Sequence, residues 1–225
     1  MCGRFTLTAT IEELIDRFAI QSFLDEENYS PSYNIAPSQS VLAIINDGIS
    51  NRMGFLKWGL IPPWSKDPSI GNKLINARAE TLPEKPSFRH AFRKKRCLIV
   101  ADSFYEWKRV DTKTKSPMRI KLKSEELFAM AGIWEHWKSP EGKSHYTCSV
   151  ITTIPNKLME DIHNRMPVIL RQDDEKTWLN PSITDMQILQ RLLEPYDENE
   201  MEAYEVSSLV NSPANNSIEL IQKIG

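Results

Sequence analysis

Closely spaced short apolar segments in the middle of the chain constrain its fold more than any other feature. Between residues 97 and 152, such segments follow one another with only polar connections between them, and no helical pattern separates one from the next. Residues 118–123 alternate between apolar and basic side chains, which is typical of a half-buried strand with a basic outer face. Strands without crossover helices between them pair in antiparallel sheets. The sequence therefore predicts an α+β fold with a mostly antiparallel, barrel-like β core and peripheral helices.

The expected elements place strands in the middle and helices nearer the ends. The predicted strands cover residues 4–7, 41–45, 53–58, 97–100, 103–108, 118–123, 128–134, 146–152 and 203–206. The predicted helices are 11–18, a helix opened by Pro155, 173–179 and 184–193. Thr10 and Glu13 form a capping box for the first helix, and Asn46-Asp47-Gly48 predicts a hairpin turn. Residues 65–96 are predicted to be one long polar connection, and a loop of this length in a compact domain is usually either a functional site or a wrongly assigned element.

Composition places the chain among ordinary globular proteins, with 40% hydrophobic and 26% charged residues. The net charge of −2 does not indicate a nucleic-acid binder, so a polyanion site would have to be a local patch. No internal repeat or linker is visible, and a single domain over residues 2–222 is expected. The apolar runs are too short to span a membrane, no signal peptide is recognisable, and three scattered cysteines suit a reducing compartment. We therefore expect a cytoplasmic protein.

Metal and cofactor sites are not expected from the sequence. The four histidines are scattered, and neither a CxxC nor an HExxH motif occurs. Two of the three cysteines, Cys97 and Cys148, lie in apolar strand segments, where cysteine behaves as a small hydrophobic residue. No glycine-rich phosphate-binding motif is present, so a nucleotide cofactor has no support. We expect neither a metal ion nor a cofactor.

The chain begins with Met1-Cys2-Gly3-Arg4-Phe5, which places a cysteine next to the initiator methionine. Removal of Met1 requires a small second residue, and Cys2 meets that requirement. Loss of Met1 would leave an α-amine and a thiol on Cys2, with ordinary pKa values of about 8 and 8.5. Such an aminothiol can condense with an aldehyde to a Schiff base and then close a thiazolidine, or it can be a hydrolytic nucleophile with its own amine as base. The alternative is that Cys2 is an arbitrary second residue.

Two further residues are candidates for proton transfer. Glu106 lies among aromatic residues on a predicted central strand, where burial would raise its pKa toward use as a general acid. Alternatively, Glu106 faces solvent while its aromatic neighbours pack. His163 lies at a predicted helix end before Pro167 and could shuttle protons. A histidine at a helix end can equally be a favourable surface charge.

A polar segment and a basic run could contribute to ligand binding. Asn76 could orient a nucleophile or hold an oxyanion, and Arg78 suits a phosphate oxygen. Alternatively, Asn76 is an ordinary loop cap and Arg78 forms a surface ion pair. The densest basic run could form a groove that combines charge with base stacking, or it could be a solvated face. The residues of this predicted groove are Arg89, His90, Arg93, Lys94, Lys95 and Arg96, together with Arg4, Trp64 and Arg78.

Six motifs together are more specific than any one of them. They are Met1-Cys2-Gly3-Arg4-Phe5, Tyr33-Asn34-Ile35-Ala36-Pro37, Trp58-Gly59-Leu60-Ile61-Pro62, Ile75-Asn76-Ala77-Arg78-Ala79-Glu80-Thr81, Phe104-Tyr105-Glu106-Trp107 and His163-Asn164-Arg165-Met166-Pro167. In this order they resemble the SRAP family, the SOS-response-associated, abasic-site-processing proteins, of bacterial or phage type. The resemblance spans nearly the whole chain, to Val210-Asn211-Ser212 and Glu219-Leu220-Ile221.

The resemblance implies a covalent sensor of abasic sites in single-stranded DNA. Cys2 would form a thiazolidine crosslink with the aldehyde of the ring-opened sugar and so shield the lesion. Asn76 would position Cys2, Glu106 would handle protons around the amine and imine, and His163 would help to open the sugar ring. Arg4 and Arg78 would hold phosphates, and Trp64 would stack on a base, although some relatives carry two adjacent tryptophans there. The DNA-binding residues implied in this way are Arg4, Asn34, Pro37, Trp64, Arg78 and Thr152.

Two other functions remain open at this level. An N-terminal-nucleophile amidohydrolase would use Cys2 against an amide, with Asn76 as oxyanion donor, and would need no DNA groove. A non-catalytic single-stranded DNA-binding protein would show salt-sensitive affinity and no dependence on Cys2. The family resemblance also implies a peptidase-like, autoproteolytic activity, and Schiff-base chemistry implies weak lyase activity at abasic sites. A monomer is the expected oligomeric state.

Overall fold

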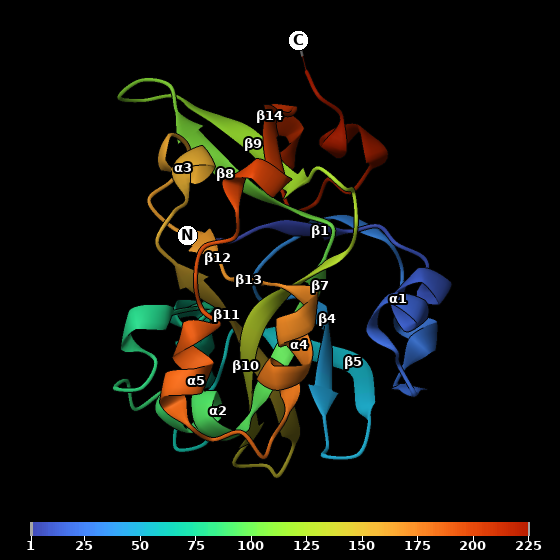
Figure 1. Ribbon diagram of the computed structural model, residues 1–225, viewed down its shortest axis with the longest axis vertical. Coiled ribbons are helices and arrows are strands. Elements are labelled where there is room, and N and C mark those ends of the chain that lie inside the picture. Colours follow the sequence, from blue (N-terminus) through green and yellow to red (C-terminus); the bar gives the residue numbers. More distant parts are fainter. Residues whose placement is uncertain (1, 225) are drawn as a thin grey trace.

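Five strands close into a barrel of mixed strand direction at the centre of the molecule (Figure 1). The protein is described here by a computed structural model, which covers residues 2–224. The barrel strands are β4 (Ser40–Asn46), β5 (Asn51–Trp58), β7 (Arg96–Ala101), β10 (Phe128–Lys138) and β11 (Ser144–Thr153). They pair in the order β11-β10-β7-β4-β5, and β5 closes the barrel by a parallel pairing with β11 at Cys148 and Trp58.

Four short strands extend the barrel sheet, and a second sheet lies beside it. The short strands are β2 (Ser22–Phe23), β6 (Asn76–Arg78), β12 (Met166–Pro167) and β13 (Ile169–Leu170). The second sheet is fully antiparallel, in the order β14 (Met201–Glu205), β9 (Lys115–Leu122), β8 (Ser103–Arg109), β1 (Phe5–Leu7) and β3 (Ser32–Ile35). The predicted α+β fold with a mostly antiparallel, barrel-like core is confirmed.

Helices are short and lie around the sheets (Figure 1). The α-helices are α1 (Ile11–Phe18), α2 (Arg89–Lys94), α3 (Lys157–Glu160), α4 (Gln172–Leu179) and α5 (Met186–Arg191). The 3₁₀ helices are η1 (Glu26–Asn28), η2 (Pro68–Lys73), η3 (Ala79–Thr81), η4 (Glu198–Glu200), η5 (Ser208–Asn211) and η6 (Ile218–Ile221). The capping box predicted for the first helix is present: Thr10 accepts from the Glu13 backbone N–H, and Glu13 accepts from the Thr10 backbone N–H. None of the helices in residues 2–224 is long and apolar enough to cross a membrane.

Two predicted elements differ in the structure. Residues 65–96 are not one irregular connection, because they contain η2, β6, η3 and α2. The strand β6 exists because it pairs with β11, which lies far away in the sequence, and three residues are too few to show a periodic pattern. The helix predicted to open at Pro155 instead begins after Asn156, whose side chain accepts from the backbone N–H of Met159, and it is only four residues long.

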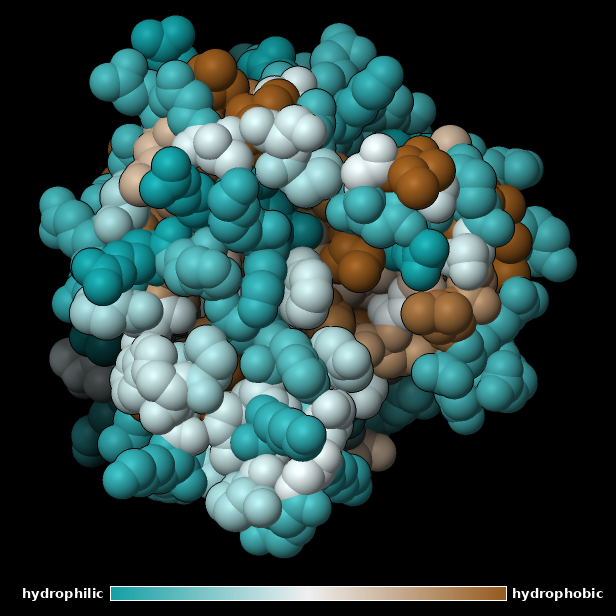
Figure 2. Space-filling model, turned by 90° about the horizontal axis from the view of Figure 1, so that it is seen from below, coloured by the Kyte–Doolittle hydropathy of each residue, from teal (hydrophilic) through white to brown (hydrophobic). Residues whose placement is uncertain are grey.

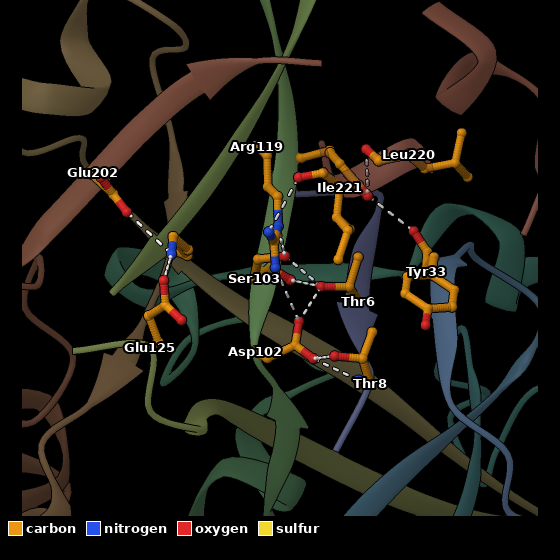
Figure 3. A network of polar contacts seen from close by, with 12 residues as sticks. Thr6, Thr8, Tyr33, Asp102, Ser103, Arg119, Glu125, Glu202, Leu220 and Ile221 are labelled. Atoms are coloured by element: carbon orange, nitrogen blue, oxygen red, sulfur yellow. Dashed lines mark hydrogen bonds and ion pairs between the residues drawn. The ribbon is translucent and has the colours of Figure 1, made fainter. Parts of the chain in front are cut away.

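The predicted basic outer face of β9 is wrong for Arg119, which is buried. Its Nε donates to Ser103 Oγ at 2.8 Å, and its Nη1 donates to the Tyr204 hydroxyl at 2.6 Å and the Ile221 carbonyl at 3.3 Å. Figure 3 shows this network, in which Asp102 also accepts from the hydroxyl of Thr6. The Arg119 side chain therefore forms its hydrogen bonds inside the protein, where they link β8 and β9 to the C-terminal segment.

The end of the barrel at the hairpin turns carries an apolar hollow. A cavity of about 350 Å³ lies there. It is lined by Leu24, Asp25, Ala43, Ile45, Arg52, Met53, Gly54, Phe55, Leu56, Trp134 and Tyr146. Figure 2 views the molecule from this end, where apolar side chains gather among polar ones. Neither Cys2 nor Glu106 lines this hollow.

Candidate active site at the start of the chain

The second sheet places Cys2 beside Glu106. Phe5 pairs with Phe104 in antiparallel register, and the Tyr105 backbone N–H donates to the Arg4 carbonyl at 2.9 Å. The residues that precede β1 therefore run alongside the centre of β8. Cys2 is fully buried. Burial raises the pKa of its thiol, the negative charge of Glu106 raises it further, and a hydrogen bond from the Arg4 backbone N–H acts in the opposite direction.

Asn76 reaches the same point from the barrel. Its strand β6 pairs with β11, where Asn76 lies opposite Val150. The Asn76 Nδ2 donates to the Cys2 carbonyl at 2.7 Å, which fixes the backbone at Cys2. Asn76 Oδ1 is buried and accepts no hydrogen bond within the part of the chain that the structure describes. A buried amide oxygen can still accept a hydrogen bond from a donor that comes within reach.

Glu106 and His163 bring a carboxyl group and an imidazole to the cluster. The Glu106 side chain is only 3% exposed, and its Oε2 lies 4.0 Å from His163 Nε2. Burial raises the pKa of Glu106, and the charge that His163 carries when protonated acts against this rise. The prediction that aromatic neighbours bury this carboxylate is confirmed, since Phe104 and Tyr105 are both fully buried. A carboxyl group with a raised pKa is suited to exchange protons near neutral pH.

A feature that sequence reasoning missed holds the His163 ring in place. The Arg165 backbone N–H donates to His163 Nδ1 at 3.1 Å. The Arg165 guanidinium donates to both carboxylate oxygens of Glu80, at 2.6 and 3.0 Å. Both residues lie within motifs identified above, and their opposite charges are the only signal in the sequence for the pair.

The residues expected to bind DNA occupy very different environments. Arg78 is exposed, and Trp64 is 59% exposed. By contrast, Arg4, Asn34 and Thr152 are buried. The remaining residue of this group is Pro37, which is half-buried. Two of the six, Arg78 and Trp64, are therefore exposed.

Arg4 and Asn34 bind each other and the C-terminal segment. Arg4 Nη1 donates to Asn34 Oδ1 and to the Val210 carbonyl, both at 2.6 Å. Asn34 Nδ2 lies within hydrogen-bond distance of the carbonyls of Val210, Ser212 and Asn215. The Arg4 guanidinium also lies 5.7 Å from the ring centre of Trp107. In this structure both side chains support the strand that follows Cys2.

The predicted basic groove does not form as one surface. Arg96 is buried, and its guanidinium donates to five backbone carbonyls. Lys95 is paired with the buried Glu135 at 2.5 Å. In Figure 1 the helix α2, which carries most of the run, lies far from the start of the chain. The sequence shows four consecutive basic residues, but Arg96 is the first residue of β7 and its side chain is buried in the protein.

Within residues 2–224, no three His, Cys, Asp or Glu side chains gather in a way that could hold a metal ion. The groups that meet at the cluster are a thiol, an amide, a carboxyl group and an imidazole. Together they can supply a nucleophile, a hydrogen-bond donor and acceptor, and two proton-transfer groups.

The cluster is a candidate active site built around a cysteine at position 2 of a β-barrel protein. A family model described as SOS response associated peptidase (SRAP) matches residues 1–213. The chain belongs to this family, and the resemblance drawn from the six motifs is confirmed.

Named relatives are similar over nearly the whole chain. Abasic site processing protein YoqW of Bacillus subtilis (strain 168) is 66% identical over 222 residues, which cover 99% of this chain and 99% of YoqW. Abasic site processing protein HMCES of Mus musculus is 30% identical over 268 aligned positions, which cover 98% of this chain and 75% of HMCES. A crystal structure of a protein from Bacteroides thetaiotaomicron superposes with a TM-score of 0.89 at 32% identity, covering 99% of this chain and 100% of that protein.

Proposed function

We propose that this protein captures abasic sites in single-stranded DNA through a covalent bond to Cys2. The observation that carries the proposal is the convergence of Asn76, Glu106 and His163 on an N-terminal cysteine. The names of the relatives, which describe abasic site processing, support the same assignment. Family membership connects it with the SOS response to DNA damage.

The chemistry follows from the two nucleophiles that Cys2 would carry once Met1 is removed. The amine adds to the aldehyde of the ring-opened abasic sugar and loses water, which gives a Schiff base. The thiol then adds to the carbon of the C=N bond, and the nitrogen takes up a proton, which closes a thiazolidine. The product holds the protein and the DNA together with the net loss of one water. Because the sugar carbonyl is then masked, the strand is protected from cleavage by elimination.

The neighbouring residues would serve the proton transfers of these steps. Asn76 holds the Cys2 carbonyl and offers its buried Oδ1 to the Cys2 amine. Glu106 would accept a proton from the amine and return one to the departing hydroxyl group. His163, which lies on the solvent side of Glu106 and is 28% exposed, would assist the opening of the sugar ring. The same groups could act in reverse and release the crosslink.

DNA contacts and further activities belong to the same proposal. Arg78 would hold a phosphate and Trp64 would stack on a base, since both side chains are accessible. Lyase activity at the Schiff-base stage and a peptidase-like release of Met1 are side reactions that the same groups could support. We also propose that the protein acts as a monomer, and that it works in the cytoplasm and joins the nucleoid while bound to DNA.

The first test is a denaturing gel of the protein mixed with a single-stranded oligonucleotide that carries one abasic site. The wild type should give a band that survives denaturation, with an intact mass equal to protein plus DNA less one water. The Cys2→Ala variant should give no such band. Cys2→Ser keeps the amine but lacks the thiol, so any adduct it forms should be trapped only after reduction of the Schiff base.

Two controls separate the alternatives. An oligonucleotide without the lesion should give no covalent band with the wild type. If the mass of the free protein proves that Met1 is absent and the abasic oligonucleotide still gives no adduct, the abasic-site proposal fails. In that case hydrolysis of amide substrates by the wild type, but not by Cys2→Ala, would favour the amidohydrolase. Salt-sensitive DNA binding that is independent of Cys2 would favour a non-catalytic binder.

A further inference from the structure

Strand β5 changes its partner along the edge that faces away from β4. Its end pairs in parallel with β11, over two residues of each strand. Its start pairs in parallel with β2, and the Leu24 backbone N–H extends that pairing by donating to the Met53 carbonyl at 2.9 Å. Among the strands that the structure describes, β2 and β11 do not pair with each other. The barrel wall therefore has a seam between them, bounded by Leu24 and Asp25 on one side and by Ser144–Tyr146 on the other.

The edge of β11 that faces this seam offers unpaired backbone groups. The Cys148 carbonyl accepts from the Gly59 N–H at 2.9 Å, and the Val150 N–H donates to the Ile75 carbonyl at 3.0 Å, both on the side away from β10. Backbone groups along a strand alternate between its two sides, so those of Tyr146 face the same side. The pairing with β5 ends before Tyr146 is reached. A free strand edge of this kind is a template for an added strand.

The apolar hollow lies behind the seam, because both sides of the seam line it. Leu24 and Tyr146 stand at its opening and are 54% and 52% exposed. Ala43 and Gly54 leave room inside, since neither has a large side chain. The volume of about 350 Å³ can take one large apolar side chain. In an added strand, alternate side chains point to opposite faces, so one of them would enter the hollow while its neighbours stay outside.

Charges along the seam favour a peptide over a nucleic acid. Asp25 lines the hollow, and Glu26 follows it as an exposed residue at the start of η1. Asp25 has a φ of +58°, in the left-handed region, so β2 cannot continue along the seam and occupy it. The exposed Lys143 precedes the opposite side. Phosphates would be repelled by the carboxylates, whereas a peptide with charges of both signs can match the two sides.

We propose that the seam between β2 and β11 binds an extended peptide segment of another protein by strand addition, with one large apolar side chain of that segment in the hollow. Backbone hydrogen bonds to the β11 edge would supply affinity, and the hollow would select the side chain. This inference goes beyond the proposed function. Neither Cys2 nor Glu106 lines the hollow, so the peptide and the damaged DNA would bind at the same time.

The test uses synthetic heptapeptides with phenylalanine, leucine, isoleucine or tryptophan at the centre, threonine beside it, and lysine and glutamate near the two ends. In ¹⁵N NMR of the full chain, at least one of them should shift the amide signal of Tyr146. Hydrogen exchange at that amide should slow by at least about tenfold at saturation. The same peptide methylated on two consecutive backbone nitrogens keeps its side chains but loses donors on both edges. It should bind at least about tenfold more weakly.

Two variants of the protein provide a matched comparison. Leu24→Lys places a charge at the opening of the hollow and should weaken peptide binding by at least about tenfold. Ile49→Lys makes a similar change at a residue that is 93% exposed and does not line the hollow, so its affinity should stay within about twofold of wild type. Both variants should crosslink an abasic oligonucleotide at the wild-type rate, because neither residue belongs to the cluster around Cys2.

Four results would overturn the proposal. One is that none of the four peptides binds at about 1 mM. Another is equal binding of the methylated peptide, which would make the hollow a site for an apolar group without strand addition. The third is an equal loss of affinity in Leu24→Lys and Ile49→Lys. The last is a dimer in sedimentation that Leu24→Lys abolishes, since the occupant would then be a second copy of this chain. If the wild type forms no crosslink, the proposed function fails, while peptide binding still decides the role of the seam.

Discussion

At the scale of single residues, the most informative group is the carboxyl of Glu106. It lies on the central strand of the second sheet, almost without solvent contact, beside the thiol of Cys2. An ionised carboxylate loses hydration there, which is why burial raises its pKa. Such a residue opposes folding at neutral pH, so a role in the proposed proton transfers would account for its presence there.

The variant Glu106→Gln should therefore separate stability from activity. The raised pKa of Glu106 means that the folded state binds the proton more tightly than the unfolded state. Folded-state stability is thus present at low pH and is lost as the pH rises from the ordinary value of 4.5 through the raised value. Glutamine does not titrate, so the Tm of Glu106→Gln relative to wild type should increase between about pH 4 and pH 7.

Crosslinking by Glu106→Gln should be slower by about 10- to 100-fold, because an amide cannot transfer the proton. Binding to undamaged single-stranded DNA should not change. Calorimetry at several pH values and a time course of the crosslinked band measure the two effects. Equal crosslinking rates would remove Glu106 from the mechanism, and a pH-independent Tm difference would mean that its carboxyl does not titrate differently in the folded state.

Some of these residues could be predicted from the sequence, and others could not. Aromatic neighbours on both sides of Glu106 indicate a packed strand, and a carboxylate within it is conspicuous. The burial of Arg96 gives no such signal, because it depends on five carbonyls that come from two separate stretches of chain, residues 92–93 and 178–183. An arginine in a basic run resembles a surface residue until the ends of neighbouring helices are placed around it.

At the scale of elements, the connection between β5 and β6 places Asn76 in the site. Gly59 and Gly71 approach each other backbone to backbone there. A Cβ atom on Gly71 would lie 2.7 Å from the Gly59 carbonyl oxygen, and Gly59 itself has a φ of +133°. The next residues are then held by the Trp58 indole N–H, which donates to the Ile75 carbonyl at 2.8 Å. The close contact of the two glycines thus fixes the path of the chain shortly before Asn76, the residue whose amide binds the Cys2 carbonyl.

The variant Gly71→Ala should be destabilised by about 1–3 kcal/mol, because the backbone must shift to accept the methyl group. It should also crosslink more slowly, since the shift would move Asn76. Gly54→Ala is the matched control, because a Cβ atom there meets Leu24 only at 3.5 Å, an ordinary contact. Thermal melts and crosslinking rates of both variants check this. A stable and fully active Gly71→Ala would show that the approach of the two segments is not required.

The same comparison explains which elements the sequence could predict. The hairpin of β4 and β5 follows from local information, namely two apolar segments around Asn46-Asp47-Gly48. The strand β6 does not, since its three residues become a strand only by pairing with β11, more than seventy residues later in the chain. Its motif could be recognised by resemblance, but its position beside Cys2 depends on the closed barrel.

At the scale of the whole molecule, the two ends of the chain depend on each other. The carbonyls of Val210, Ser212 and Asn215 all lie around the amide nitrogen of Asn34. The Trp107 indole N–H donates to Asn211 Oδ1 at 2.7 Å. The segment around η5 therefore packs against the sheet that holds the residues after Cys2. This arrangement joins the last part of the chain to the candidate site.

The variant Asn34→Ala should consequently act on the whole fold, because it leaves the buried Arg4 guanidinium with one acceptor fewer and removes the amide that lies between the carbonyls of Val210, Ser212 and Asn215. We expect a loss of about 2–4 kcal/mol in the free energy of unfolding and a Tm lower by on the order of 10 °C. Hydrogen exchange should become faster in residues 207–216 and in β1. Asn216→Ala, which removes an exposed side chain that binds the Tyr33 backbone N–H, should cost at most about 1 kcal/mol. If Asn34→Ala instead keeps its Tm and loses only affinity for DNA, then Asn34 contacts DNA directly, as the family resemblance implies, and the chain ends are held together by other contacts.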